Sequence, residues 1–109
     1  MRGLLENVIT KFNAKFDSDP TLRDEIGDLQ KTVLIELKDG TKWHFILKDH
    51  HVAALLDGGV DKADITILTD ADTLRALLLR ETGPFKAYAT GKLKFKGSLD
   101  DLARFRKFF

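Results

Sequence analysis

The residues with the clearest potential for metal or acid–base chemistry are His44, His50 and His51, the only histidines in the chain. Asp49 precedes the adjacent pair, so a metal ion would require these side chains to converge within a turn. On a strand, neighbouring residues point to opposite faces, which would keep His50 and His51 apart. We favour solvated histidines at a turn and expect no metal site. The chain has no cysteine, which excludes thiolate ligands and thiol catalysis.

Motifs for enzymatic catalysis are not found in the sequence. It contains no nucleophile elbow, phosphate-binding loop or dinucleotide-binding fingerprint. Ser98 is followed three residues later by Asp101, a spacing typical of a helix cap rather than of a nucleophile. We therefore expect no enzymatic activity from this chain alone, and no cofactor.

Lys92, Lys94 and Lys96 alternate with Leu93 and Phe95, the period of two expected of a half-buried strand. A surface for single-stranded nucleic acid would need aromatic side chains on the same face as the lysines, but the alternation places Phe95 on the opposite face. A solvated edge strand protected by lysines is the simpler interpretation, and contact of the same lysines with acidic phospholipid head groups stays open. The formal net charge of +1 provides no overall field for nucleic acid. We expect no nucleic-acid partner.

The chain of 109 residues, 43% hydrophobic and 32% charged, predicts one soluble domain over residues 1–109. No apolar run reaches the length of a membrane span. The first residues, MRGLLENVITKF, lack the continuous apolar core of a signal peptide. We therefore expect a cytoplasmic location.

Hydrophobic periodicity predicts an α+β fold in which an antiparallel-rich mixed sheet of five strands is covered on one face by about five helices. The expected helices are 3–16, a short one after Pro20, 71–80, one starting at Pro84, and 98–109; the expected strands are 33–37, 42–48, 51–56, 64–69 and 92–96. Asp39-Gly40 predicts a tight hairpin turn. Thr69-x-x-Asp72 and Ser98-x-x-Asp101 resemble capping boxes at two helix starts.

The C-terminal half contains more large apolar residues than a single core-facing helix stripe requires. Six of them in the last helix spread over roughly 220° of arc: Leu99, Leu102, Ala103, Phe105, Phe108 and Phe109. In the helix 71–80, Leu79 points away from the stripe of Leu74, Leu77 and Leu78. Three interpretations remain open: a filled core, an apolar cavity, and an exposed patch for dimer formation or membrane contact.

Four segments in a particular order suggest a family. They are LKDGTKWHF (37–45), KADITI (62–67), DADTLRALLLRET (70–82) and GPFKAYATGKLKFKGSLDDLARF (83–105). This order and spacing resemble the sterol carrier protein (nonspecific lipid-transfer) domain from about Lys31 to the C-terminus, with a looser match over the N-terminal helix. The last segment carries the most specific part of the resemblance.

The resemblance implies an apolar tunnel between sheet and helices that binds a fatty acid, acyl-CoA, phospholipid or other lipid with low selectivity. It also implies that the C-terminal helix acts as a flap at the tunnel mouth and touches a membrane transiently. Combined with the strand alternation, it gives these candidate ligand-binding residues: Trp43, Phe45, Ile65, Ile67, Leu74, Leu77, Leu78, Phe85, Tyr88, Phe95, Leu102 and Phe105.

Other functions remain open beside lipid carriage. The chain could present its lipid to a partner enzyme, or be a ligand-free interaction module that forms a homodimer through Phe105, Phe108 and Phe109. The tunnel could also be filled by the protein's own side chains. The chain ends in Lys107-Phe108-Phe109 and not in the peroxisomal address of eukaryotic members, so we expect a freestanding member of prokaryotic type.

Overall fold

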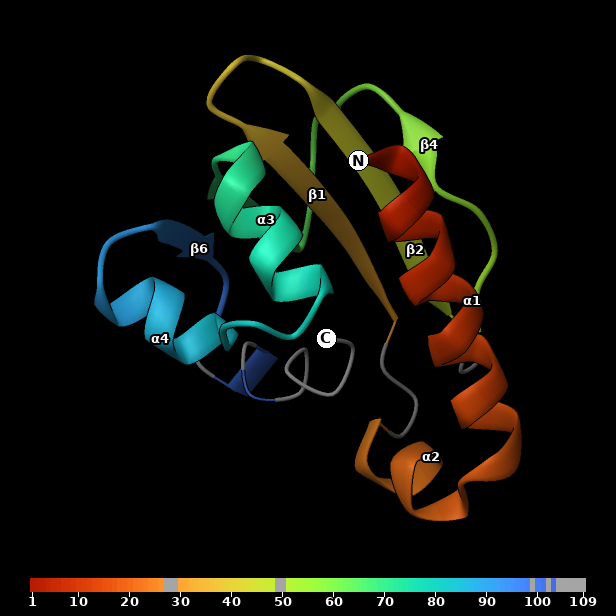
Figure 1. Ribbon diagram of the computed structural model, residues 1–109. Helices are drawn as coiled ribbons and strands as arrows, with labels where there is room; N and C mark the ends of the chain where they lie inside the picture. The colour runs from red at the N-terminus through yellow and green to blue at the C-terminus, as the bar shows by residue number, and fades with distance from the viewer. Residues whose placement is uncertain (27–29, 49–50, 99, 102, 104–109) are drawn as a thin grey trace.

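The computed structural model describes residues 1–26, 30–48, 51–98, 100, 101 and 103. Figure 1 shows helices packed in front of a twisted sheet. In chain order the elements are α1 (Arg2–Ser18), α2 (Pro20–Ile26), β1 (Lys31–Leu37), β2 (Lys42–Lys48), β3 (His51–Val52), β4 (Leu56–Asp57), β5 (Ile65–Thr69), α3 (Ala71–Leu78), α4 (Pro84–Ala89) and β6 (Leu93–Lys96). The predicted α+β class is confirmed.

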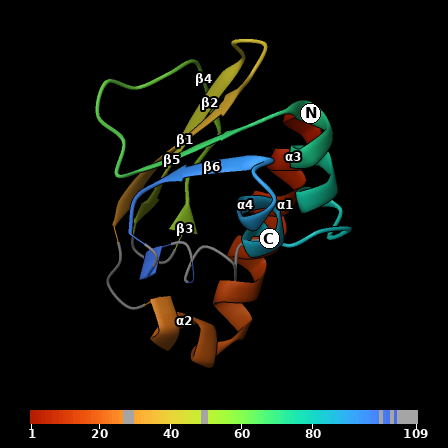
Figure 2. The ribbon, with the colours of Figure 1, turned by 90° about the vertical axis from the view of Figure 1, so that its left-hand side faces the viewer.

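The sheet is mixed and mainly antiparallel, as predicted. Its strand order is β3-β2-β1-β5-β6, and β4 also pairs with β2. Only β1 and β5 pair in parallel among the described strands. The chain must therefore cross the sheet between β4 and β5, and it does so on the side away from the helices (Figures 1 and 2).

The predicted strand 51–56 is divided into β3 and β4 by an extra residue. Val52 pairs with Leu47 and Leu56 pairs with His44. The three residues 53–55 thus lie opposite only two residues of β2, which is the geometry of a β-bulge. The sheet has six strands where five were expected, because one predicted strand forms two short ones on the same edge.

The strands alternate as the sequence predicts. In β2, Trp43, Phe45 and Leu47 are buried, while the Ile46 side chain is 43% exposed. Val33 pairs with both Phe45 and Ile65 in the adjoining strands, so the three side chains lie on one face. The result is one continuous apolar sheet face.

Helices α1, α3 and α4 lie on that apolar face (Figure 2). Helix α1 buries Leu5, Ile9, Phe12 and Phe16. The rings of Phe12 and Phe16 meet edge to face, with centroids 4.4 Å apart. Among the described residues, four helices have defined bounds where about five were expected; Asp100, Asp101 and Ala103 are also helical, and the rest of that predicted helix lies outside the described residues.

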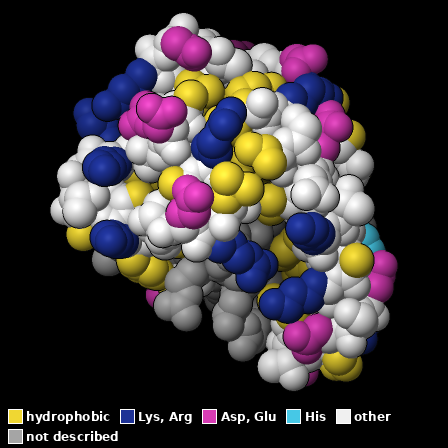
Figure 3. Space-filling model, viewed as in Figure 1, with side chains coloured by type: hydrophobic (Ala, Val, Ile, Leu, Met, Phe, Trp, Pro, Cys, Tyr) yellow, Lys and Arg dark blue, Asp and Glu magenta, His cyan; other side chains and the backbone are white. Residues whose placement is uncertain are grey.

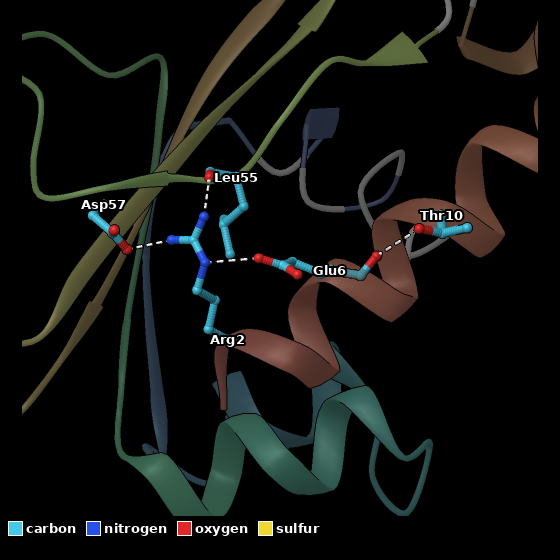
Figure 4. A network of polar contacts seen from close by, with 5 residues as sticks. All are labelled: Arg2, Glu6, Thr10, Leu55 and Asp57. Atoms are coloured by element: carbon cyan, nitrogen blue, oxygen red, sulfur yellow. Dashed lines mark hydrogen bonds and ion pairs between the residues drawn. The ribbon is translucent and has the colours of Figure 1, made fainter.

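Two polar side chains of α1, to which the sequence assigned no role, hold this helix to the β3–β4 edge. The Arg2 guanidinium donates to the Leu55 carbonyl oxygen at 2.7 Å and forms ion pairs with Glu6 and Asp57 (Figure 4). The Asn13 amide donates to the Val52 carbonyl at 2.8 Å and accepts from the Val52 N–H at 2.9 Å. These contacts satisfy backbone groups at the bulged edge, where regular ladder bonds are lost.

Phe45 and Ile46 are adjacent in β2 and allow a direct test of which sheet face is buried. Replacing the fully buried Phe45 with alanine should lower the free energy of unfolding by about 3–5 kcal/mol, because it removes a large apolar side chain and leaves a cavity. Ile46→Thr, on the open face, should change it by no more than about 0.5 kcal/mol. Urea unfolding followed by circular dichroism measures both; equal losses would contradict the assignment of faces.

Candidate functional site

Most of the predicted ligand-binding residues lie in one layer between the sheet and the helices. The sheet contributes Trp43, Phe45, Ile65 and Ile67, and α3 contributes Leu74, Leu77 and Leu78. All seven are buried in the same core cluster, and Phe95 of β6 is partly buried against it. The Phe95 ring occupies the space beside Gly97, where a Cβ atom would come within 3.0 Å of it. The final glycine of GKLKFKG thus allows this ring position.

Helix α3 is held in place by its N-terminal cap. The Asp70 carboxylate accepts from the Thr73 N–H at 2.7 Å and from the Thr73 hydroxyl at 2.9 Å. These hydrogen bonds from Thr73, the backbone N–H foremost, lower the pKa of Asp70 from its ordinary value of 3.8. The predicted capping box at Thr69 is therefore wrong by one residue. Thr69 is fully buried, and its hydroxyl donates to the Lys92 carbonyl at 2.9 Å instead.

The second predicted cap is confirmed at Ser98. Its side-chain oxygen accepts from the Asp101 N–H at 3.0 Å. Helix α3 ends in a Schellman turn, in which the Arg80 N–H donates to the Leu77 carbonyl and the Glu81 N–H donates to the Ala76 carbonyl. Arg80 occupies the left-handed position of this turn with φ of 60°, and it is the only non-glycine residue with positive φ in the described part of the chain. Glycine is the usual residue there, so Arg80 carries backbone strain.

The remaining candidates lie elsewhere. Helix α4 buries its small residues Pro84 and Ala87, whereas Phe85 is 40% exposed and Tyr88 is 45% exposed. Phe85 and Tyr88 are thus outside the buried layer. Leu102 and Phe105 lie outside the described residues, as do Phe108 and Phe109.

Two open clefts lie between α3 and α4, with volumes of about 310 and 440 Å³. Lys86 and Thr82 border both clefts; Lys92 borders the first and Arg80 the second. Of the predicted ligand-binding residues, only Leu77 borders either of them. Because they share only Leu77 with the predicted lining, these clefts are largely separate from the apolar layer.

The histidines that the structure describes have polar partners. A ring nitrogen of His51 lies 2.9 Å from the Asp17 carboxylate, and a ring nitrogen of His44 lies 2.9 Å from the Gly58 carbonyl. Asp49 and His50 lie outside the described residues. No group of three or more His, Cys, Asp or Glu residues is arranged to hold a metal ion in the described ranges.

The chain also matches a family model. Residues 9–109 match the model of the SCP-2 sterol transfer family. The chain belongs to this family. The resemblance seen in the sequence is thus confirmed, and the match includes most of α1. Domains of this family in general bind and transfer lipids without catalysis, although some occur within enzymes.

Several solved structures share the fold. Palmitated SCP2L2 from Aedes aegypti aligns with a TM-score of 0.66 and 17% identity, over 94% of this chain and 90% of that protein. The apo form of sterol carrier protein 2 from Yarrowia lipolytica has a TM-score of 0.65 and 21% identity, over 99% of this chain and 91% of that one.

A larger protein contains a similar domain. The sec-alkylsulfatase Pisa1 from Pseudomonas sp. aligns with a TM-score of 0.65 and 19% identity over 81% of this chain, which spans only 14% of that protein. Among curated protein sequences, none is significantly similar. Within the described residues of this SCP-2 family member, no helix is both long and apolar enough to cross a membrane.

The Asp70 cap should make stability depend on pH. Because the folded pKa lies below the unfolded one, the cap stabilises the protein above the unfolded value and this contribution is lost as pH falls through the folded pKa. Asp70→Ala should cost about 1 kcal/mol near neutral pH and progressively less below pH 3.8. Asp70→Asn, which keeps a capping oxygen but does not titrate, should retain most of the stability. Urea unfolding over a pH series measures this; a pH-independent cost of Asp70→Ala would contradict it.

The strain at Arg80 gives a second prediction for this SCP-2 domain. Arg80→Gly should raise the free energy of unfolding by up to about 1 kcal/mol, since relief of strain exceeds the added entropy of the unfolded chain. Arg80→Ala removes the same charge but keeps the left-handed Cβ, so it should change stability by less than about 0.5 kcal/mol. Thermal and urea unfolding compare the two. Equal effects would show that the charge, not the backbone, determines stability here.

Proposed function

We propose that this protein binds a lipid with a long apolar chain between the sheet and the helices, with low selectivity, and carries or presents it. Fatty acids, acyl-CoA and phospholipids are the candidate ligands. The observation that carries the proposal is the continuous apolar layer of β2, β5, β6 and α3, found in a chain of the SCP-2 family. The palmitated state of the similar SCP2L2 supports an acyl chain as ligand.

The proposed binding energy comes from burial of the acyl chain. Each buried methylene contributes about 0.8 kcal/mol, so a long chain gains useful affinity without a specific polar contact. The same property explains low selectivity, because an apolar wall discriminates weakly among chains of similar length.

The proposed entrance lies at the β6 edge of the sheet. Phe95 is only partly buried there, whereas Ile65 and Ile67 on the neighbouring strand are 1% exposed. Leu102 and Phe105, which lie outside the described residues, stay in the proposed lining on the resemblance to the family. Phe85 and Tyr88 on the outer face of α4 would touch only a part of the ligand that emerges from the layer.

A second candidate is a domain whose layer is filled by its own side chains. Phe45, Leu74 and Leu77 are 0% exposed, which favours a closed interior in the absence of ligand. In that case the protein would act through its surface as an interaction module. A carrier must instead open the layer between α3 and the sheet to admit a chain.

Trp43, the only tryptophan, lies in the proposed lining and provides a direct test. Titration with a bromine-labelled fatty acid should quench its emission saturably, because bromine quenches only at contact range. Unlabelled fatty acid should compete. Native mass spectrometry of the purified protein, followed by lipid extraction, should find a bound acyl lipid. If neither bound lipid nor quenching is found, the proposal of lipid carriage is overturned. The second candidate, an interaction module with a closed interior, is then favoured.

A matched pair of variants separates ligand contact from general stability. Leu78 lies in the proposed lining, whereas Leu22 is a buried residue of α2, and Figure 1 shows that helix α2 lies far from helix α3. Leu78→Gln should weaken fatty-acid binding about tenfold or more, because it places a polar amide against an acyl chain. Leu22→Gln should destabilise folding but leave the affinity of the folded protein near that of the wild type.

A further inference from the structure

The two clefts between α3 and α4 adjoin each other, since Thr82 and Lys86 border both of them. Their floor contains buried or half-buried small residues: Thr73, Ala76, Thr82, Pro84 and Ala87. Their rim contains exposed charged residues: Asp72, Arg80, Glu81, Lys86 and Lys92. Figure 3 shows charged side chains of both signs next to hydrophobic ones over the region of α3 and α4 in Figure 1. The volumes of about 310 and 440 Å³ lie within the range of small-molecule sites.

The basic side chains at the rim have no carboxylate partner. In the part of the chain that the structure describes, Arg80, Lys86 and Lys92 form no ion pair. The two carboxylates at the rim, Asp72 and Glu81, form none either. The rim thus carries three cations and two carboxylates, one net positive charge, and direct contact does not neutralise the cations. This distribution of charge favours an anionic ligand.

Arg80 borders the second cleft at a cost in backbone strain. Its φ of 60° belongs to the left-handed region, where glycine is the usual residue at this position of a helix end. The negative end of the α3 dipole does not require a cation at this position, because Arg75 already lies in the last turn of the helix. Strained residues cluster at ligand-binding sites. The strain therefore indicates a role for the Arg80 guanidinium beyond folding.

The clefts lie next to the apolar layer. Leu77 belongs to the buried core cluster and also borders the second cleft. Lys92 borders the first cleft and directly precedes Leu93, the first residue of β6, whose edge is the proposed entrance. A lipid whose chain enters the layer at this edge would therefore have its polar end close to the clefts.

We propose that the two clefts bind the phosphate-bearing polar end of a lipid whose chain occupies the apolar layer. This inference rests on the proposed function and adds a polar site to the apolar one. In this arrangement the planar Arg80 guanidinium donates two parallel hydrogen bonds to phosphate oxygens. The Lys86 ammonium, at the border of both clefts, supplies a point charge, and Lys92 pairs with a further anionic group in the first cleft.

The number of cations and the size of the clefts favour phosphate over a free carboxylate. A fatty acid carries one negative charge on two oxygens, and a single cation is enough to pair with it. Two adjoining clefts of these volumes, with three cations, match a larger group that contains phosphate oxygens. Lysophospholipids and coenzyme A thioesters both carry such a group on a single acyl chain, and the test below distinguishes them.

Competition with the bromine-labelled fatty acid, followed through Trp43 emission, tests this site in the full chain. Three competitors share one acyl chain and are used below their critical micelle concentrations: palmitate, palmitoyl lysophosphatidic acid and palmitoyl-CoA. At low salt, at least one phosphorylated competitor should bind the wild type about tenfold more tightly than palmitate. High salt should reduce this difference. The phosphorylated competitor that binds more tightly identifies the source of the phosphate.

A matched pair of double variants tests the residues. Arg80→Gln with Lys86→Gln should weaken binding of the phosphorylated competitor about tenfold and leave palmitate within about twofold of the wild type. Lys94→Gln with Lys96→Gln removes two cations from the opposite sheet face, because their partners Leu68 and Thr66 alternate with Ile67 of the helix-covered face. This control should retain the preference for phosphate. Circular dichroism verifies that both variants are folded.

Arg80→Gly separates ligand binding from folding. It should raise the free energy of unfolding, as predicted above, and yet weaken binding of the phosphorylated competitor about fivefold. An arginine with a merely structural role would show only the change in stability.

Two results would overturn this site. One is equal affinity of the wild type for palmitate and both phosphorylated competitors at low salt. The other is an equal loss of affinity in the Arg80–Lys86 variant and in the Lys94–Lys96 control. Either result leaves palmitate binding, and therefore lipid carriage, intact. If no competitor binds, palmitate included, lipid carriage is overturned together with this site, so the two failures are distinguishable.

Discussion

The parallel pairing of β1 with β5 is the constraint on which the rest of the structure depends. Val33 and Ile35 of β1 face the helices between their partners in β2 and β5, so β1 is the centre of the apolar face. A parallel neighbour cannot be reached by a hairpin, so the chain crosses the helix-free side before β5 begins. This crossing leaves the opposite face free for α1, α3 and α4, and it places β6 at the edge where the proposed entrance lies.

The sequence predicted those parts of the fold that follow from local patterns. Alternation in 42–48 assigned Trp43 and Phe45 to the buried face, and Asp39-Gly40 predicted the hairpin, which closes with Gly40 in a left-handed conformation. The order of four short motifs identified the family before any three-dimensional information. Each of these features depends on residues that are close together in the chain, or on their order.

The features that the sequence did not predict depend on contacts between distant segments. The bulge at residues 53–55 arises because Val52 and Leu56 pair with β2 in different registers, while Asn13 of α1 bonds the Val52 backbone. The cap of α3 is Asp70 rather than Thr69, because the Thr69 hydroxyl is buried against β6. Contacts with segments distant in the sequence determine the bulge and the cap, and a local spacing rule does not account for such contacts.

The predicted ligand-binding residues show the same division between local patterns and distant contacts. Side-chain size and hydrophobicity alone do not decide which of these residues are buried. Phe85 is as apolar as Phe45 and Phe95, and Tyr88 is at least as large, yet α4 turns Pro84 and Ala87 inward, because small side chains let this short helix lie close to the sheet. The same backbone must then direct its large rings outward. A helix packed closely through small residues therefore closes the apolar layer at the β6 edge with its inner side and leaves its large rings outside that layer.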